Sequence, residues 1–191
     1  MRLFVGIEIS PAVVTATIEL LAQLRAACAK LAPRSRMTWV TPERFHITIR
    51  FIGQVDDTRV DEIRAVLAPP LALDPFDLAI VGVGTFPPKG SPRVVWAGLN
   101  GGRDQLTVIE ATVSERLARA GVPRDERPYN PHLTLARLRD GAGLRSVPFV
   151  GSLREISLGT TSVDAITLFE SRLSPKGPAS VALARTPLVR N

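Results

Sequence analysis

The stretch FHITIRF, Phe45–Phe51, places a histidine and a threonine two residues apart among apolar and β-branched residues. This alternation is typical of a β-strand with one buried face, because successive side chains of a strand point to opposite faces. Unbroken alternation puts His46, Thr48 and Arg50 together on one polar face. The other face, which we expect to pack in the core, carries Phe45, Ile47, Ile49 and Phe51.

A second stretch, PHLTLAR, Pro131–Arg137, repeats this pattern. It contains the only other histidine of the chain, His132, again followed by a threonine, Thr134, at the second position. Its leucines alternate with these polar residues, so we expect the same half-buried strand. Two copies that use both histidines of the chain indicate a shared site.

Strands and helices alternate around these two motifs, with turn-forming residues between them. The order strand–helix–strand–strand recurs before and after about residue 90, which predicts a coarse internal duplication with one HxT strand in each half. We therefore predict an α+β fold whose antiparallel sheets are covered by helices on one side. The expected helices are 12–31, 56–68, 101–120 and a short one within 144–154. The expected strands are 3–9, 37–40, 45–52, 76–83, 93–99, 132–138, 162–171 and 180–185.

Composition narrows the class of protein. The chain has 191 residues, 45% of them hydrophobic, which suits one globular domain, and its net charge of +6 favours anionic partners such as RNA or phosphate esters. Nearly all basic residues are arginines, which is also explained by a general compositional bias, so charge alone does not establish RNA binding.

The single cysteine excludes an intrachain disulfide. With neither a signal-peptide pattern nor an uncharged apolar run of about 18 residues, we expect a soluble cytoplasmic protein.

Two imidazoles facing one cleft suit acid–base catalysis at phosphorus. A neutral imidazole removes a proton from water, a protonated one donates a proton to the leaving oxygen, and threonine hydroxyls stabilise the phosphate oxygens. Other chemistries fit less well. Two histidines without matching cysteines or an HExxH pattern fall short of the usual ligand set of a metal site. A Ser-His-Asp triad is also poorly supported, because the sequence has no GxSxG motif to carry the nucleophilic serine. Cys28 lies mid-helix, where we interpret it as a small core residue.

The paired motifs resemble those of the 2H phosphoesterase superfamily, in particular its RNA 2′,3′-cyclic phosphodiesterase branch, also called 2′-5′ RNA ligases. Landmarks similar to those of the family follow in the expected order along nearly the whole chain. They are WVTPERFHITIRFIG (39–53), GTFPPKGSPRVVWAGL (84–99), PHLTLAR (131–137) and LFESRLSPKGP (168–178).

This resemblance implies a single bilobal domain over residues 1–191, with two antiparallel sheets related by a pseudo-twofold around a central cleft and helices on the outside. It implies hydrolysis of a ribose 2′,3′-cyclic phosphate to a 2′-phosphate without a metal or other cofactor, with 2′-5′ ligation as the reverse reaction. By resemblance, His46 is the general acid, His132 is the general base, and Thr48 and Thr134 hold the phosphate oxygens.

Two arginines are candidates for the phosphate clamp. Arg137 matches the arginine that commonly closes the second family motif, but strict alternation from His132 puts it on the opposite face unless the strand twists, bulges or ends early. Unbroken alternation puts Arg50 on the same face as His46, but it could lie too deep to reach the phosphate or pair with a carboxylate. Both stay open from the sequence.

An aromatic side chain could stack on a terminal base. Phe51, Trp96 and Tyr129 are the nearest candidates in the sequence. The first two are more typical of core positions, so we select Tyr129.

The expected partners are RNA ends or cyclic nucleotides, with no membrane and no metal, and we expect a monomer. Two alternatives stay open. One keeps the chemistry but changes the substrate to a small cyclic phosphate or a 2′-5′ linkage. The other is a non-catalytic RNA-binding module whose histidines only hydrogen-bond phosphate.

Overall fold

The structure, a computed structural model, describes residues 1–34, 36–140, 153–174 and 177–190, and over these ranges it confirms the α+β class. The helices are α1 (Pro11–Leu31), η1 (Pro42–Arg44, 3-10), α2 (Asp57–Leu67) and α3 (Arg103–Arg119). The strands are β1 (Arg2–Glu8), β2 (Arg36–Trp39), β3 (His46–Gln54), β4 (Leu71–Ala72), β5 (Phe76–Phe86), β6 (Val94–Asn100), β7 (Leu133–Asp140), β8 (Ser157–Val163), β9 (Ala165–Ser174) and β10 (Gly177–Val189).

The strands form one sheet made of two halves. Its order is β4-β10-β9-β1-β3-β7-β6-β5-β8, with β2 added to β7. The two HxT strands, β3 and β7, meet in the middle, where a single residue pair, Ile47 with Leu133, joins them. We call the part from β4 to β3 the first half-sheet and the part from β7 to β8, with β2, the second half-sheet. The two expected sheets are thus halves of one sheet, and its one parallel pair among the described strands is β10 with β4.

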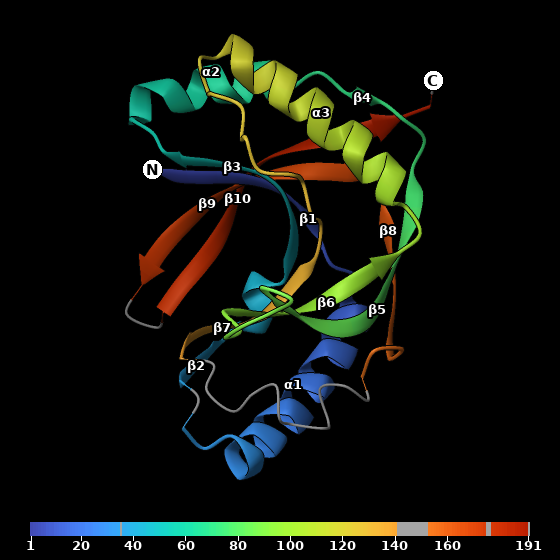
Figure 1. The fold of residues 1–191 in the computed structure, drawn as a ribbon. Helices are drawn as coiled ribbons and strands as arrows, with labels where there is room; N and C mark the ends of the chain where they lie inside the picture. Colours follow the sequence, from blue (N-terminus) through green and yellow to red (C-terminus); the bar gives the residue numbers. More distant parts are fainter. Residues whose placement is uncertain (35, 141–152, 175–176, 191) are drawn as a thin grey trace.

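The helices cross between the halves. Helix α1 follows β1 of the first half-sheet but packs against β8 of the second, whereas α3 follows β6 of the second and packs against β3 of the first (Figure 1). Helix α2 lies beside α3 on the same side of the molecule. Each half-sheet is therefore covered by the helix that follows a strand of the other, which fits an internal duplication and ties the halves together.

Helix α1 is a core helix. One stripe of it is buried against the sheet, and Cys28 in that stripe is a core residue as expected, with its thiol pKa raised by burial. By length and composition alone the same helix could cross a membrane. A helix that packs in a protein core passes the same test, and one stripe of α1 is buried in this structure. Its buried residues are Val13, Thr17, Leu20, Leu21, Leu24 and Cys28.

Helix boundaries follow their local signals closely. Pro11 opens α1 at a position where its missing N–H costs nothing. At the end of α3, Gly121 adopts φ +69°, a conformation that favours glycine, and the amide of Val122 donates to the carbonyl of Leu117 at 3.0 Å. These signals explain why the three long helices were predicted to within about two residues.

The strand predictions near the carboxy terminus need correction. The expected strand 162–171 is two strands, because the chain turns a corner at Asp164 between β8 and β9. Its apolar pattern continues across that corner, so periodicity alone did not reveal it. The expected strand 180–185 is part of the longer β10, and β4 was not predicted. The expected short helix within 144–154 lies outside the described residues, apart from 153–154, which form a turn.

Candidate active site

The seam between the half-sheets brings the two HxT motifs together. Ile47 and Leu133, the middle residues of the motifs, pair across it and are fully buried. Because the pair is antiparallel, each histidine stands across the seam from the threonine of the other motif. All four polar side chains then share the face opposite the buried pair. The chain thus assembles one four-residue polar cluster from segments 86 residues apart in sequence.

A β-bulge follows the first motif. On β1, Gly6 pairs with Thr48 and the next residue along, Val5, pairs with Arg50, so Ile49 is the extra residue of β3. A bulge reverses the alternation of the residues beyond it. Predictions that assume unbroken alternation therefore fail after this point.

Phe51 and Arg50 exchange their expected places because of this bulge. Phe51 pairs with Phe4 on the same face as His46, and its side chain is 48% exposed. Arg50 is only 5% exposed. The expectation that Phe51 packs in the core with Ile47 is therefore wrong, and Arg50 is not an open partner of the two histidines.

The second motif carries the same bulge. Thr134 pairs with Trp96 and Ala136 with Val95, so Leu135 is the extra residue of β7. Arg137 consequently lies on the face of His132, is exposed, and lines the cleft. This is the bulge that the sequence required if Arg137 was to reach the site. Phe51 and Arg137, each five residues after its histidine, occupy equivalent places in the two halves.

The imidazole of His46 is held in a fixed orientation. Its Nδ1 lies 2.7 Å from the carbonyl oxygen of Arg44, which only accepts, so Nδ1–H donates there. Its Nε2 lies 3.1 Å from Thr48 Oγ1 and accepts from that hydroxyl. The ring packs against Phe4 with centroids 4.6 Å apart. Nε2 is therefore the nitrogen left for proton transfer.

His132 has the same arrangement. Its Nδ1 donates to the carbonyl oxygen of Asn130 at 2.7 Å, again two residues before the histidine. The edge of its ring meets Phe86, with centroids 5.2 Å apart and planes at 76°. Nε2 of this ring also remains for chemistry, so the two halves present their histidines in the same tautomer.

Burial and positive charge keep both imidazoles neutral in the free protein. Burial lowers the pKa of His46 to about 4, with further lowering by Arg44 and Arg137, although the bond to the Arg44 carbonyl opposes the shift. Burial likewise lowers the pKa of His132, and Arg137 lowers it further. The charge of His132 itself depresses the pKa of His46, which is expected of two rings that share one site.

A cleft of about 530 Å³ opens at this seam, a volume that suits a nucleotide-sized ligand. His46 is not among its lining residues. It borders a smaller cavity of about 230 Å³ and reaches the main cleft through its contact with Thr48. The cleft is lined by Thr48, Ile49, Arg50, Phe51, Phe86, Val94, Glu110, Asp125, Arg127, Pro128, Tyr129, Asn130, His132, Thr134 and Arg137.

The donors in this cleft are of the kind that bind phosphate. Thr48 and Thr134 offer hydroxyls, and Arg137 offers a guanidinium whose fork matches phosphate oxygens. Across the described ranges, no three His, Cys, Asp or Glu side chains stand close enough together to bind a metal ion.

Tyr129 lines the cleft but is largely buried. Its hydroxyl donates to the backbone carbonyl of Thr48 at 3.3 Å, which ties the loop before β7 to the first motif. Burial raises the pKa of this phenol. The geometry thus gives Tyr129 a positioning contact, in addition to any contact with a base that the sequence predicts.

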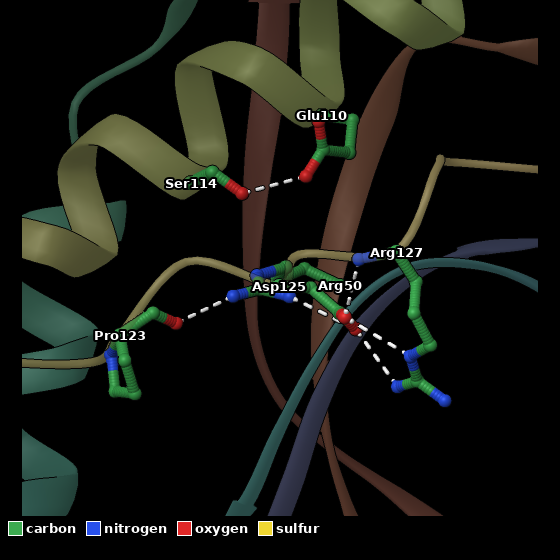
Figure 2. A network of polar contacts seen from close by, with 6 residues as sticks. All are labelled: Arg50, Glu110, Ser114, Pro123, Asp125 and Arg127. Atoms are coloured by element: carbon green, nitrogen blue, oxygen red, sulfur yellow. Dashed lines mark hydrogen bonds and ion pairs between the residues drawn. The ribbon is translucent and has the colours of Figure 1, made fainter.

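Arg50 anchors the same loop. Its Nη2 donates to the carbonyl oxygen of Pro123 at 2.5 Å, and its Nη1 lies 3.3 Å from Asp125 (Figure 2). Arg127 also bonds this carboxylate, through Nε at 3.0 Å and Nη2 at 2.9 Å. These bonds to Arg127, with the nearby charge of Arg50, lower the pKa of Asp125 to about 2. Asp125 and Arg127 were not named as site candidates, although the charged loop sequence VPRDERPYNP was a signal. Phe51 was considered for base stacking and set aside as more typical of a core position.

Known proteins are similar to this chain in sequence and in fold. Residues 15–174 match the sequence model described as the 2′-5′ RNA ligase superfamily. A protein of Aeropyrum pernix is 38% identical over 146 residues, which cover 74% of this chain and 81% of the relative, and one of Archaeoglobus fulgidus is 32% identical over 182 residues, which cover 93% and 95%. Both are named RNA 2′,3′-cyclic phosphodiesterase. A crystal structure of a Thermus thermophilus protein superposes with a TM-score of 0.76 at 26% identity and covers 98% of both chains.

Proposed function

This chain belongs to the 2′-5′ RNA ligase superfamily, and on that premise we propose that it is an RNA 2′,3′-cyclic phosphodiesterase. The curated relatives with this name support the proposal at 38% and 32% identity. The observation that carries it is the pair of imidazoles at the seam, each fixed through Nδ1 and each leaving Nε2 for proton transfer. Such a pair supplies one acid and one base to a single phosphate.

In the proposed reaction, water attacks the cyclic phosphorus and the bond from phosphorus to the ribose 3′-oxygen breaks. His132 Nε2 takes the proton of the attacking water, and His46 Nε2–H gives a proton to the departing 3′-oxygen. The products are a 2′-phosphate and a free 3′-hydroxyl. With the 5′-hydroxyl of a second RNA as the nucleophile in place of water, the same two groups support 2′-5′ ligation.

The general acid has to gain its proton as the substrate binds. Both imidazoles have lowered pKa values in the free protein, so both are neutral near pH 7. The negative charge of a bound phosphate offsets the charge of Arg137 and raises the pKa of the adjacent imidazole. Protonation is thereby coupled to substrate binding.

The remaining cleft residues stabilise charge on the phosphate. Thr134 donates a hydroxyl hydrogen bond to a non-bridging oxygen, and Thr48 does the same once His46 Nε2 is protonated and no longer accepts from its hydroxyl. Arg137 balances the charge that develops on these oxygens. Arg50 and Tyr129 act through the loop and the strand that they hold and are positioning residues. No step requires a metal ion in this mechanism.

The proposal is tested by incubating the protein with a 2′,3′-cyclic nucleotide in the presence of EDTA and identifying the product. We expect turnover to the 2′-phosphate that chelation does not affect. Absence of turnover, turnover abolished by EDTA, or a 3′-phosphate product contradicts the proposal. Thr15→Ala, on the exposed face of α1, controls for preparation effects.

RNA ends are the proposed substrate class, and a cytoplasmic monomer is the proposed state. A cyclic mononucleotide, an RNA ending in a cyclic phosphate and a 2′-5′-linked dinucleotide, compared at equal concentration, separate the possible substrates. Binding of RNA without hydrolysis, unchanged by His→Gln substitutions, would instead indicate a non-catalytic RNA-binding module. Light scattering of the purified protein measures its oligomeric state.

A further inference from the structure

A second groove continues from the catalytic cleft. It has a volume of about 490 Å³ and shares Arg50, Phe51, Asp125 and Arg127 with the cleft, so the two hollows are adjacent along the loop before β7. Neither histidine lines it, and the proposed reaction leaves it without a role. Its other lining residues are Ile52, Gly53, Val122, Pro123, Arg124 and Glu126.

Phe51 stands at the boundary between the cleft and this groove. At 48% exposure it is the only aromatic member of the exposed large hydrophobic side chains in the described part of the chain. The bulge at Ile49 turns it outward, where an unbroken strand would have buried it. An exposed aromatic ring beside a nucleotide-sized cleft is a surface on which a nucleobase can stack.

Positive charge lines the same groove as this ring. Arg127 is highly exposed, yet two of its nitrogens and its backbone amide are bonded to Asp125, and Asp125 is paired with the buried Arg50. The guanidinium is therefore oriented in advance, and one carboxylate is shared by two arginines. Arg124 and Glu126, both exposed, add one charge of each sign, so the groove keeps a net positive charge.

We propose that this groove is a second subsite, which binds the nucleotide that precedes the cyclic-phosphate end of a single-stranded RNA. Its base stacks on Phe51, and the phosphodiester that links it to the terminal nucleotide faces Arg127. This inference rests on the proposed function, because the terminal nucleotide occupies the catalytic cleft. Each hollow has room for about one nucleotide, so the chain continues from one to the other.

The subsite predicts that the enzyme prefers a chain to a single nucleotide. We expect kcat/KM for a dinucleotide with a 2′,3′-cyclic end to exceed that for the cyclic mononucleotide by about tenfold or more, which is the effect of stacking one base. Equal values for the two substrates in the wild-type protein would overturn the subsite while leaving the phosphodiesterase proposal intact.

Two substitutions locate this preference. Phe51→Ala should reduce the dinucleotide-to-mononucleotide ratio of kcat/KM by about tenfold, whereas Phe51→Trp should keep it. Arg127→Ala should reduce the ratio severalfold and weaken its dependence on salt. Val108→Ala and Arg119→Ala are matched controls: Val108 is an exposed apolar residue on α3, and Arg119 is an exposed arginine paired with Glu115. Ratios unchanged in both Phe51→Ala and Arg127→Ala would refute the assignment.

A binding measurement tests the groove without turnover. A dinucleotide that ends in a 2′-phosphate and carries 2-aminopurine as its first base should lose fluorescence on binding the wild-type protein, because stacking quenches this base. Phe51→Ala should abolish the quenching, and Val108→Ala should retain it. Binding without quenching, or quenching that survives Phe51→Ala, contradicts the subsite. If the protein hydrolyses no cyclic phosphate, the proposed function fails and this measurement still decides about the groove.

Discussion

The two HxT halves share one backbone plan and differ at the positions beyond their bulges. In both, the histidine Nδ1 donates to the carbonyl two residues earlier, and a bulge follows the threonine. The position five residues after the histidine is then Phe51 in the first half and Arg137 in the second. In the proposed mechanism the repeated part supplies the acid–base pair. In the proposed binding mode the divergent part divides substrate contacts between the aromatic ring of Phe51 and the cation of Arg137.

The position before these two residues also differs between the halves. It is Arg50 in the first half and Ala136 in the second, and both are buried. Arg50 extends to the loop before β7, so the first half holds the segment that delivers the second histidine. The halves are therefore coupled in structure, through the contacts of Arg50 with this loop.

The largest effects should come from the histidines, where the halves are alike. His46→Ala and His132→Ala should each lower kcat on a 2′,3′-cyclic nucleotide by roughly 10²- to 10⁴-fold, because each removes one partner of the proton transfer. Steady-state kinetics with a circular dichroism check of folding measures this. If either variant retains full rate, that histidine has no part in the mechanism.

Arg137→Ala tests a difference between the halves, because the equivalent position in the first half is Phe51, which carries no charge. We expect a loss of roughly 10²-fold in kcat/KM, which corresponds to removing a charge-assisted contact to the phosphate. Because Arg137 lowers the pKa of both imidazoles, its removal should raise both and move the pH optimum of kcat/KM upward. In the wild-type protein that optimum should lie below about pH 6.5, since both pKa values are lowered.

Arg139→Ala is the matched control for this change, because it removes an exposed arginine from the same strand. It should leave the pH optimum in place. An optimum that does not move in Arg137→Ala would show that this guanidinium lies too far from the imidazoles to act on them.

Stability should depend on pH through His46. Its pKa is about 4 in the folded protein and about 6.5 when unfolded, so the unfolded state binds a proton first as the pH falls. This contribution to stability is complete above pH 6.5 and is lost towards pH 4. We expect a loss of about 2 kcal/mol, after a discount for partial solvent exposure.

Urea unfolding of the wild-type protein and His46→Gln across this pH range measures that difference. In His46→Gln the free energy of unfolding should lack this part of its pH dependence. The same measurement on His132→Gln compares the two halves. Parallel stability curves for wild type and His46→Gln would contradict the lowered pKa.

The smallest effect should come from the loop anchor. Arg50→Met keeps the buried aliphatic stem but removes the bonds to Pro123 and Asp125, and we expect a stability loss of about 1–2 kcal/mol. The partner carboxylate keeps Arg127, which limits the cost. Denaturant unfolding measures the loss, and an unchanged midpoint would show that the anchor contributes nothing. Arg64→Met, at a half-exposed arginine of α2, is the control.

Much of this molecule was predictable from its sequence. The long helices carry proline and glycine signals at their ends, and the apolar alternation in both motifs located the strands that meet at the seam. The resemblance to a family, which the match over residues 15–174 confirms, supplied the reaction class.

The bulges were not predictable in the same way. The apolar residues Ile49 and Leu135 continue the alternation of the sequence. Only the strand pairing shows that Ile49 has no opposite residue on β1 and Leu135 has none on β6. Phe51 and Arg50 were consequently assigned to the wrong faces, and Arg137 could not be decided. The loop network around Asp125 depends on contacts 73 residues apart in sequence, which no local pattern reveals.

If the two halves form one acid–base site, His46 and His132 act in the same chemical step, and a double-mutant cycle on kcat measures their coupling. Groups that act in one step are strongly non-additive. We predict that the double variant His46→Ala/His132→Ala hydrolyses a 2′,3′-cyclic nucleotide about as slowly as the slower single variant. Losses that multiply in the double variant would mean that the two histidines act independently, and would contradict the account.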